Sequence, residues 1–173
     1  MAQKHNISQK QKAKIDVLVI LTVAAILLLT IAILRPLLKE PRQVASRVVC
    51  GTILSGLTKA IAVYAQGSDG RYPTPDKWCD LLLQYVTKNS FICPDARRKG
   101  DNGPSHYAIN PNATPASDPN MVLLFETKAG WNQFGGPEIL TTENHDGKYA
   151  AVAFVDGHVE YMEKKHLRNL KWK

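Results

Sequence analysis

Residues 17–34 read VLVILTVAAILLLTIAIL, a run of 18 consecutive residues without a charge, interrupted only by Thr22 and Thr30. At about 1.5 Å rise per residue, a helix of this length measures roughly 27 Å, which matches the hydrocarbon core of a bilayer. An amphipathic core helix would show a polar stripe, and a cleaved signal peptide has a shorter apolar run. The sequence therefore predicts a retained transmembrane helix over residues 15–36.

Basic residues crowd both ends of this run, as expected where charged heads stay in the headgroup region. The nearest flanking residues are Lys10, Lys12, Lys14, Arg35 and Lys39. Each side carries four basic residues within a short distance, so the positive-inside rule gives a tie. The short basic arm, residues 1–14, is the easier part to leave in the cytoplasm. We therefore expect a single-pass protein of the cytoplasmic (inner) membrane with its N-terminus in and its C-terminal domain extracytoplasmic.

The net charge of +7 is concentrated at the N-terminus. Residues 1–47 hold eight basic and two acidic side chains, whereas the other 126 residues hold 14 basic and 13 acidic ones. A nucleic-acid-binding domain would carry its basic residues on one of its own faces. The sequence thus predicts the lipid bilayer, and no nucleic acid, as a partner.

Beyond the membrane segment, residues 37–66 are expected to form an amphipathic stem helix, since apolar residues recur there at helical spacing. The predicted stripe is Val44, Val48, Ile53, Leu57, Ile61 and Tyr64. A second helix is expected to begin at Thr74 as its cap, with Pro75 at the first position. Its predicted buried face comprises Trp78, Leu81, Leu82, Tyr85 and Val86.

Residues 67–173 are expected to form an α+β domain with a small antiparallel sheet. Residues 121–127 predict one strand, and residues 148–155 and 158–162 predict a hairpin joined by Asp156 and Gly157 in a type I′ turn. Residues 95–120 are rich in Pro, Asn, Gly, Ser and Asp, which predicts a loop with a short strand at 106–110. Residues 163–170 are expected to form a short closing helix.

This order of elements resembles that of type IV pilins and type II secretion pseudopilins. The stretches SRVVC at 46–50, YAQGSDGRYP at 64–73 and FICP at 91–94 are similar to motifs of the pilin-like DUF1559 group of planctomycetes and their relatives. Members of that group carry a C-terminal signature of a His, nine residues and Asp-Gly-His. Here His145 is followed by Asp156, Gly157 and His158, but ten residues intervene. The resemblance implies a pilin-like fold, in which a transmembrane helix and an amphipathic stem helix pack on a small antiparallel sheet.

The prepilin cleavage motif that this resemblance implies is missing. Aligned on Pro36, Lys14 stands where prepilins have Gly, and Val19 stands where they have Glu. We therefore expect a pilin-like domain kept as a static membrane anchor. Lateral contacts between N-terminal helices are expected to allow a homo-oligomer or pilin-like partners.

Two groups of side chains are candidates for chemistry. His145, Asp156 and His158 are of ligand type for a divalent metal, but Asp156 and Gly157 are needed by the predicted turn, so we expect no metal and no cofactor. Cys50, Cys79 and Cys93 are disulfide candidates. Cys79–Cys93 is one pairing, Cys50–Cys93 is the one that the family-like motifs suggest, and three buried thiols are the alternative.

The sequence contains no nucleophile elbow, phosphate-binding loop or dinucleotide fingerprint. We expect a non-enzymatic protein with a structural or interaction role in the cell envelope. The alternative is a membrane-anchored, metal-dependent or ligand-binding domain that uses the region of His145, Asp156 and His158.

Overall fold

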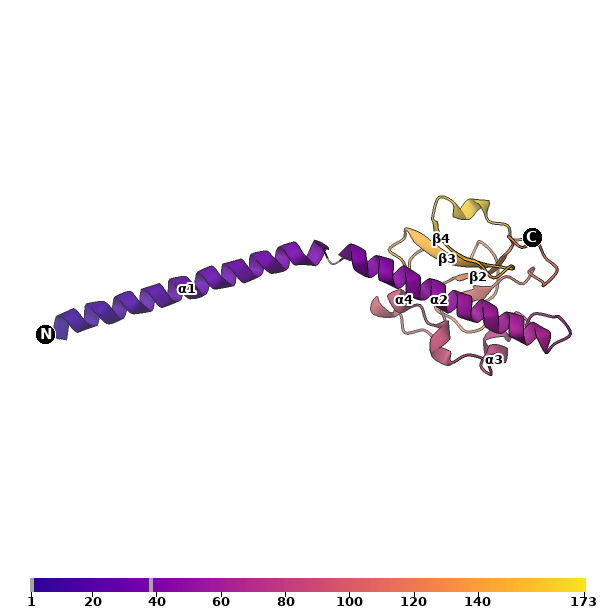
Figure 1. Cartoon of the computed structure of the whole chain (residues 1–173), viewed down its shortest axis with the longest axis horizontal. Helices are drawn as coiled ribbons and strands as arrows, with labels where there is room; N and C mark the ends of the chain where they lie inside the picture. Colours follow the sequence, from indigo (N-terminus) through magenta and orange to yellow (C-terminus); the bar gives the residue numbers. More distant parts are fainter. Residues whose placement is uncertain (1, 38) are drawn as a thin grey trace. The chain divides into compact units, whose positions relative to one another are not determined.

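The structure is a computed structural model (Figure 1). It describes the backbone of residues 2–37 and 39–173, and the side chains of residues 17–35, 45, 46 and 48–173. The chain divides into two compact units, residues 1–42 and 43–173, which are described separately. Since the division falls inside the stem helix, most of that helix belongs to the same unit as the sheet.

The first unit contains the long helix α1, Ala2–Leu37, so the predicted helix over 15–36 is confirmed as a helix. Within it, Val17–Arg35 is long and apolar enough to cross a membrane, and none of its residues is buried. A membrane span and a signal sequence both fit this finding. Arg35 is exposed, whereas the predicted flanking side chains of Lys10, Lys12, Lys14 and Lys39 lie outside the described part.

Helix α2, Lys39–Gln66, is the predicted stem helix. Its segment Val48–Gln66 also passes the length and composition test for a span, but more than a third of it is buried within the domain, as in a core helix. The predicted stripe is correct at Leu57 and Ile61 and wrong at Val48, which is 65% exposed. The inner face instead includes Cys50 and Leu54, while the side chain of Val44 lies outside the described part.

The sheet has four antiparallel strands in the order β1-β2-β3-β4, namely Tyr107–Ile109, Val122–Glu126, Tyr149–Phe154 and Val159–Glu163. All four lie within the predicted strands or one residue beyond them. A register shift between Val122 and Leu124 interrupts the pairing of β2 with β3. The extra residue of a bulge breaks the alternation of faces, which explains why Leu123 and Leu124 both pack in the same core.

The β3–β4 hairpin is confirmed, but the predicted type I′ turn is wrong. The Gly157 N–H donates to the Phe154 carbonyl at 2.9 Å, and the Phe154 N–H donates to the His158 carbonyl at 3.0 Å. A type I′ turn needs positive φ at both central residues, whereas here Gly157 has φ +93° and Asp156 is not in that region. The loop is therefore a three-residue one that closes on a left-handed glycine.

The remaining helices are short: α3 (Trp78–Leu82), η1 (Lys88–Phe91), α4 (Pro94–Arg98) and η2 (Leu167–Asn169). The second predicted helix thus begins later and ends sooner than expected. Lys77, not Thr74, is the cap residue of α3, and Tyr85 is exposed. Helix α4 lies in the predicted loop, and η2 is all that forms of the predicted closing helix.

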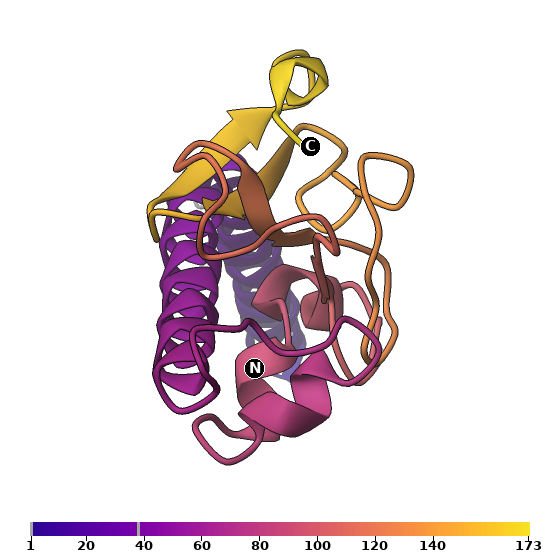
Figure 2. The same ribbon diagram turned by 90° about the vertical axis from the view of Figure 1, so that its right-hand side faces the viewer.

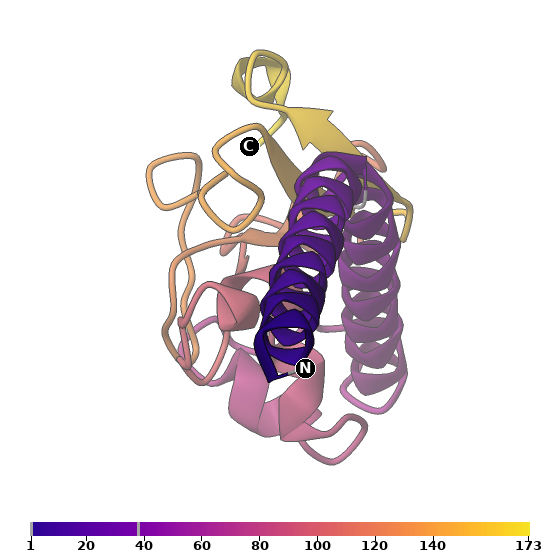
Figure 3. The ribbon, with the colours of Figure 1, turned by 90° about the vertical axis from the view of Figure 1, so that its left-hand side faces the viewer.

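Two cores lie on the two faces of the sheet. The larger core joins α2, α3 and the inner face of the sheet; Figure 2 shows the sheet at one side of it, α3 at the other and α2 alongside both. The smaller core includes Phe125 and Phe154 on the outer face, covered by Leu167, Leu170 and Trp172 of the C-terminal segment. Figure 3 shows that segment, in yellow, beyond the strands. The α+β class and the small antiparallel sheet are as predicted.

Candidate functional site

A cluster of polar side chains is buried between α2 and the inner face of the sheet. Four of its members offer one metal-ligating atom each, and these four atoms all lie within 4.8 Å of one another. They are Cys50, Cys93, Glu126 and His145, and each residue is at least nine-tenths buried. Asp95 and Tyr161 adjoin them.

Glu126 reaches this position as the last residue of β2. Side chains alternate along a strand, so Glu126 shares the inner face with Leu124. Ala151 of β3 presents only a methyl group there, and its N–H donates to Glu126 Oε2 at 2.9 Å. The side chain of Glu126 is completely buried. Burial of an isolated carboxylate has a large free-energy cost, so this side chain needs hydrogen-bonding or charged partners.

His145 lies in the loop that leads into β3, where it forms a bridge with Tyr149. The His145 and Gly147 N–H groups both donate to the Thr142 carbonyl. Asp146 and Gly147 take positive φ values of 57° and 72°, which turn the chain sharply at this point. Lys99 ties the loop to α4 through an ion pair with Asp146 at 2.9 Å. The imidazole is therefore held in place from its own loop and from α4.

Both ring nitrogens of His145 have close partners. Nδ1 lies 2.8 Å from Asp95 Oδ2, and Nε2 lies 2.8 Å from both Glu126 Oε1 and the Tyr161 hydroxyl. An ionised carboxylate only accepts, so Nδ1–H donates to Asp95. Asp95 in turn pairs with Arg98, which also donates to Ser46 Oγ of α2 at 2.9 Å.

The two sulfur atoms complete the cluster from the side of α2. Cys50 Sγ and Cys93 Sγ are 3.4 Å apart, and Cys93 Sγ is 3.9 Å from His145 Nε2. Cys93 immediately precedes α4, so the same short segment also carries Asp95. Cys79 is placed differently: its N–H donates to Asn132 Oδ1 at 2.8 Å. Of the predicted disulfide pairings, the structure brings Cys50 and Cys93 together as free thiols.

Electrostatics in the cluster oppose a free thiolate at Cys93. The hydrogen bond with Cys50 and then burial raise the pKa of Cys93 far above its usual range. Burial lowers the pKa of His145, but its bonds with Cys93 and Glu126 outweigh burial and raise that pKa to about 9. Without a bound cation, the cluster thus favours a thiol at Cys93 and a protonated imidazole at His145, which the carboxylates of Asp95 and Glu126 flank.

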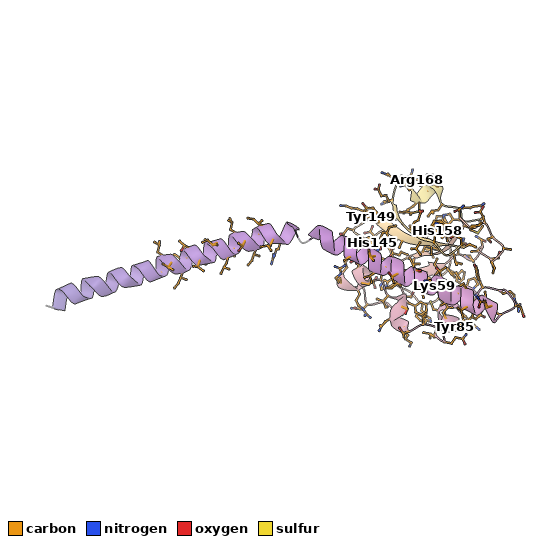
Figure 4. The ribbon with its side chains drawn as sticks, viewed as in Figure 1. Lys59, Tyr85, His145, Tyr149, His158 and Arg168 are labelled. Carbon is orange, nitrogen blue, oxygen red and sulfur yellow. The ribbon has the colours of Figure 1, made fainter. Side chains whose placement is uncertain are left out.

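Asp156 and His158 do not join His145. His158 Nδ1 is 2.5 Å from Asp156 Oδ1, and the His158 N–H also donates to that oxygen at 3.0 Å. They follow the last residue of β3, whereas His145 bridges to Tyr149 at its first residue, so about 17 Å of strand separates the two places. His145 and His158 are both labelled in Figure 4. The pair acts locally, at the hairpin turn.

Sequence reasoning did not identify Glu126, Asp95 or Tyr161 as site residues. Only Glu126 carried a usable signal, because it ends the otherwise apolar run VLLFE, and a buried carboxylate is rare unless it is paired. Asp95 follows Pro94 at the start of a segment that the sequence predicts to be a loop. Tyr161 lies in a predicted strand and fits its ordinary alternation of side chains. Their proximity to His145 arises only in the folded domain.

The described atoms thus provide two thiols, one imidazole and one carboxylate in a closed, buried arrangement, with a second carboxylate behind the imidazole. Such a set can hold a metal ion, form a disulfide or remain a hydrogen-bonded ion cluster. Comparison of the chain with protein families, with curated proteins and with solved structures finds no match.

Proposed function

We propose that this chain is a single-pass membrane protein that holds a pilin-like α+β domain on the outer side of the cytoplasmic membrane. Its role is structural or interaction-based within the cell envelope, without catalysis. The observation that carries the proposal is the apolar surface of the long segment Val17–Arg35, none of whose residues is buried.

That surface is too costly to leave in water. Thirteen large aliphatic side chains between Val17 and Leu34 are each about half exposed or more. Burial of one such side chain is worth roughly 1.5–3 kcal/mol, so the set represents roughly 20–40 kcal/mol. This exceeds the net stability of an ordinary domain, about 5–15 kcal/mol. A lipid environment supplies the missing burial along the whole circumference of the helix.

The arrangement of the second unit supports the pilin-like part of the proposal. Helix α2 packs its inner face on a four-stranded antiparallel sheet, in the order that the resemblance implies. Lys14 and Val19 stand where a prepilin has Gly and Glu, which favours a static anchor over a processed filament subunit. Contacts between the N-terminal helices are the proposed route to homo-oligomers or pilin-like partners.

The buried cluster supports a non-catalytic role. None of its four ligand-type residues is more than 7% exposed, so a substrate has no direct access to them. The Asp156–His158 pair is exposed but consists of two residues that bond to each other at a turn.

Alkaline carbonate extraction of membranes, followed by intact mass measurement, tests the anchor. We expect the chain in the pellet at full-length mass, or lacking Met1 only. Extraction into the supernatant with loss of the apolar run would show a cleaved signal sequence and overturn the proposal. Loss of everything through Lys14 would overturn the static anchor in favour of filament assembly.

Thiol labelling tests the side of the membrane. The three native cysteines are completely buried, so in the folded protein an introduced cysteine at the exposed C-terminal residue, Lys173→Cys, is the reactive one. A membrane-impermeant maleimide added to intact spheroplasts should label Lys173→Cys and leave the parent chain unlabelled. Labelling only after lysis would place the domain in the cytoplasm.

A further inference from the structure

We propose that Cys50, Cys93, Glu126 and His145 bind one zinc-type divalent metal ion, with Asp95 orienting the histidine ligand. The site is independent of the membrane topology proposed above. It departs from the sequence-based expectation of no metal, and from its weak candidates Asp156 and His158, because the structure assembles a different set around His145.

The distances between the donor atoms fit a tetrahedral ion. With metal–sulfur bonds near 2.3 Å and metal–nitrogen or –oxygen bonds near 2.1 Å, tetrahedral ligands stand about 3.8 Å (S–S), about 3.6 Å (S–N) and about 3.4 Å (N–O) apart. The structure has 3.4 Å between the two sulfurs, 3.9 Å between Cys93 Sγ and His145 Nε2, and 2.8 Å between that nitrogen and Glu126 Oε1. These three of the six donor–donor spacings each differ from the tetrahedral value by well under 1 Å, and all six are within 4.8 Å.

The orientation of His145 is that of a metal ligand with a carboxylate behind it. Nδ1–H donates to Asp95, which leaves Nε2 directed at the other three donor atoms. Metal-ligating histidines usually donate their other ring N–H to a carboxylate or carbonyl in this manner. Arg98 pairs with Asp95 and donates to Ser46, so the supporting carboxylate is itself held in place.

Hydrogen bonding from His145 Nε2 cannot serve all of the neighbours of that atom. His145 Nε2 carries at most one hydrogen, which can be donated to one good acceptor. Glu126 Oε1 and the Tyr161 hydroxyl both lie 2.8 Å from this nitrogen, and Cys93 Sγ lies 3.9 Å from it. A cation at this point binds nitrogen, oxygen and sulfur together.

One buried polar group on the same face of the sheet as Glu126 lacks a hydrogen-bond partner. The Tyr107 hydroxyl is completely buried and makes no hydrogen bond among the described atoms. Tyr107 pairs with Glu126 across β1 and β2, so the two side chains lie on the same face of the sheet. A metal-bound thiolate accepts hydrogen bonds, so it would offer this hydroxyl the acceptor that it lacks.

The competing arrangement is a Cys50–Cys93 disulfide. It requires the sulfur atoms to close from 3.4 Å to about 2.05 Å and to lose two hydrogens to an oxidant, whereas a tetrahedral ion requires the same atoms only to separate to about 3.8 Å. A disulfide also does not explain why Glu126 Oε1 and His145 Nε2 lie close to the two sulfur atoms. We therefore favour the metal.

The ion would be structural. All four ligands come from protein side chains and are buried, so no coordination position remains for substrate, which is typical of structural zinc sites. The ligands belong to α2, the segment before α4, β2 and the loop before β3. One ion would thus link the stem helix to three separate parts of the domain.

Cobalt titration of the full-length chain tests the proposal directly. The chain is purified in detergent micelles, reduced, stripped with a chelator and titrated with Co²⁺. We expect about one Co²⁺ per chain, with the near-ultraviolet band of thiolate–cobalt charge transfer and the strong visible bands of tetrahedral cobalt, and displacement by Zn²⁺. A folded chain, by circular dichroism, that shows neither band would overturn the proposal.

Variants assign the ligands. Cys93→Ser should remove most of the charge-transfer band, and Asp95→Asn should weaken Co²⁺ binding by about 10–100-fold while keeping the tetrahedral spectrum. Cys79→Ser and His158→Gln are matched controls, because they replace a buried cysteine and a histidine outside the cluster. Loss of binding in a folded control, or full binding by Cys93→Ser, would contradict the assignment. If a variant does not fold, the Co²⁺ spectrum of the wild-type chain still tests whether the site binds metal.

Thiol counting separates the metal from the disulfide. The chain is taken from membranes without reductant, denatured in the presence of chelator and alkylated. Three alkylated cysteines, together with about one zinc per chain by elemental analysis before chelation, are the expected result. Alkylation of Cys79 alone would show a Cys50–Cys93 disulfide and overturn the proposal.

Discussion

Removal of the buried carboxylate in Glu126→Ala should destabilise the domain strongly. Glu126 is completely buried and accepts from the Ala151 N–H at 2.9 Å, while its other oxygen lies 2.8 Å from His145 Nε2. Breaking a buried ionic pair costs about 3–5 kcal/mol, since the remaining partner stays buried without its counter-charge. At a urea dependence of about 2 kcal/mol per molar, a loss of about 4 kcal/mol lowers the denaturation midpoint by about 2 M.

Two further variants show whether charge or shape is responsible. Glu126→Gln keeps an oxygen that can accept from the Ala151 N–H, so it should cost less than alanine, about 1–3 kcal/mol. Glu160→Ala removes an exposed carboxylate from β4 and should change stability by less than about 0.5 kcal/mol. The expected order of destabilisation is therefore alanine at 126, glutamine at 126, then alanine at 160.

Urea denaturation of the full-length chain in detergent micelles, with chelator present, measures this order on the metal-free protein. All three tryptophans lie between residues 78 and 172, so tryptophan fluorescence reports on the second unit alone. If Glu126→Ala were as stable as Glu160→Ala, the carboxylate would contribute no net stabilisation, and the reasoning from its burial would be refuted.

Three more variants test the packing around the cluster. Leu54→Ala removes a completely buried side chain of α2 and should lower the free energy of unfolding in urea by about 3 kcal/mol. Val48→Ala, at an exposed position, should lower it by less than about 0.5 kcal/mol. The reverse order would support the apolar stripe predicted from the sequence. Gly157→Ala places a side chain at φ +93° and should cost about 1–2 kcal/mol, and an unchanged midpoint would contradict the left-handed turn. Trp172→Ala removes the ring that packs edge-on against Phe125, with 4.9 Å between the ring centroids. It should lower the free energy of unfolding, measured by circular dichroism, by about 2 kcal/mol. An unchanged stability would show that the C-terminal segment does not cover the sheet.

Local rules explain why most elements could be predicted. The apolar run of α1, the stem helix after it and the β3–β4 hairpin each depend on short-range periodicity, which a sequence displays directly. The turn type was missed because an Asp-Gly pair serves both a two-residue and a three-residue loop. The length of α3 was overestimated because apolar residues at helical spacing continue to Val86, whereas the regular helix ends at Leu82 and is followed by a single turn, in which the Val86 N–H donates to the Leu82 carbonyl at 3.0 Å.

The inner face of α2 was misjudged for a reason connected with the cluster. Periodicity selects the most apolar side chains, and so it selected Val48. The sheet, however, presents Glu126 and Tyr161 to this helix, and a buried polar group needs a partner that can interact with it. Cys50 supplies a small, polarisable group there, and Val48 faces outward. The polar groups on the opposite layer, which no local pattern shows, thus explain why a cysteine suits the inner face at position 50.

Cys50 and Cys93 connect the two proposals without making them depend on each other. Outside the cytoplasm, two free thiols whose sulfur atoms are 3.4 Å apart can be oxidised to a disulfide. Thiolates bound to a metal ion are protected from that reaction. A disulfide found in membrane-derived protein would place the domain in an oxidising compartment, which supports the anchor topology while removing the metal. A zinc-bound chain whose Lys173→Cys variant reacts with impermeant maleimide would support both. A zinc-bound chain that is labelled only after lysis would keep the metal site and place the domain in the cytoplasm.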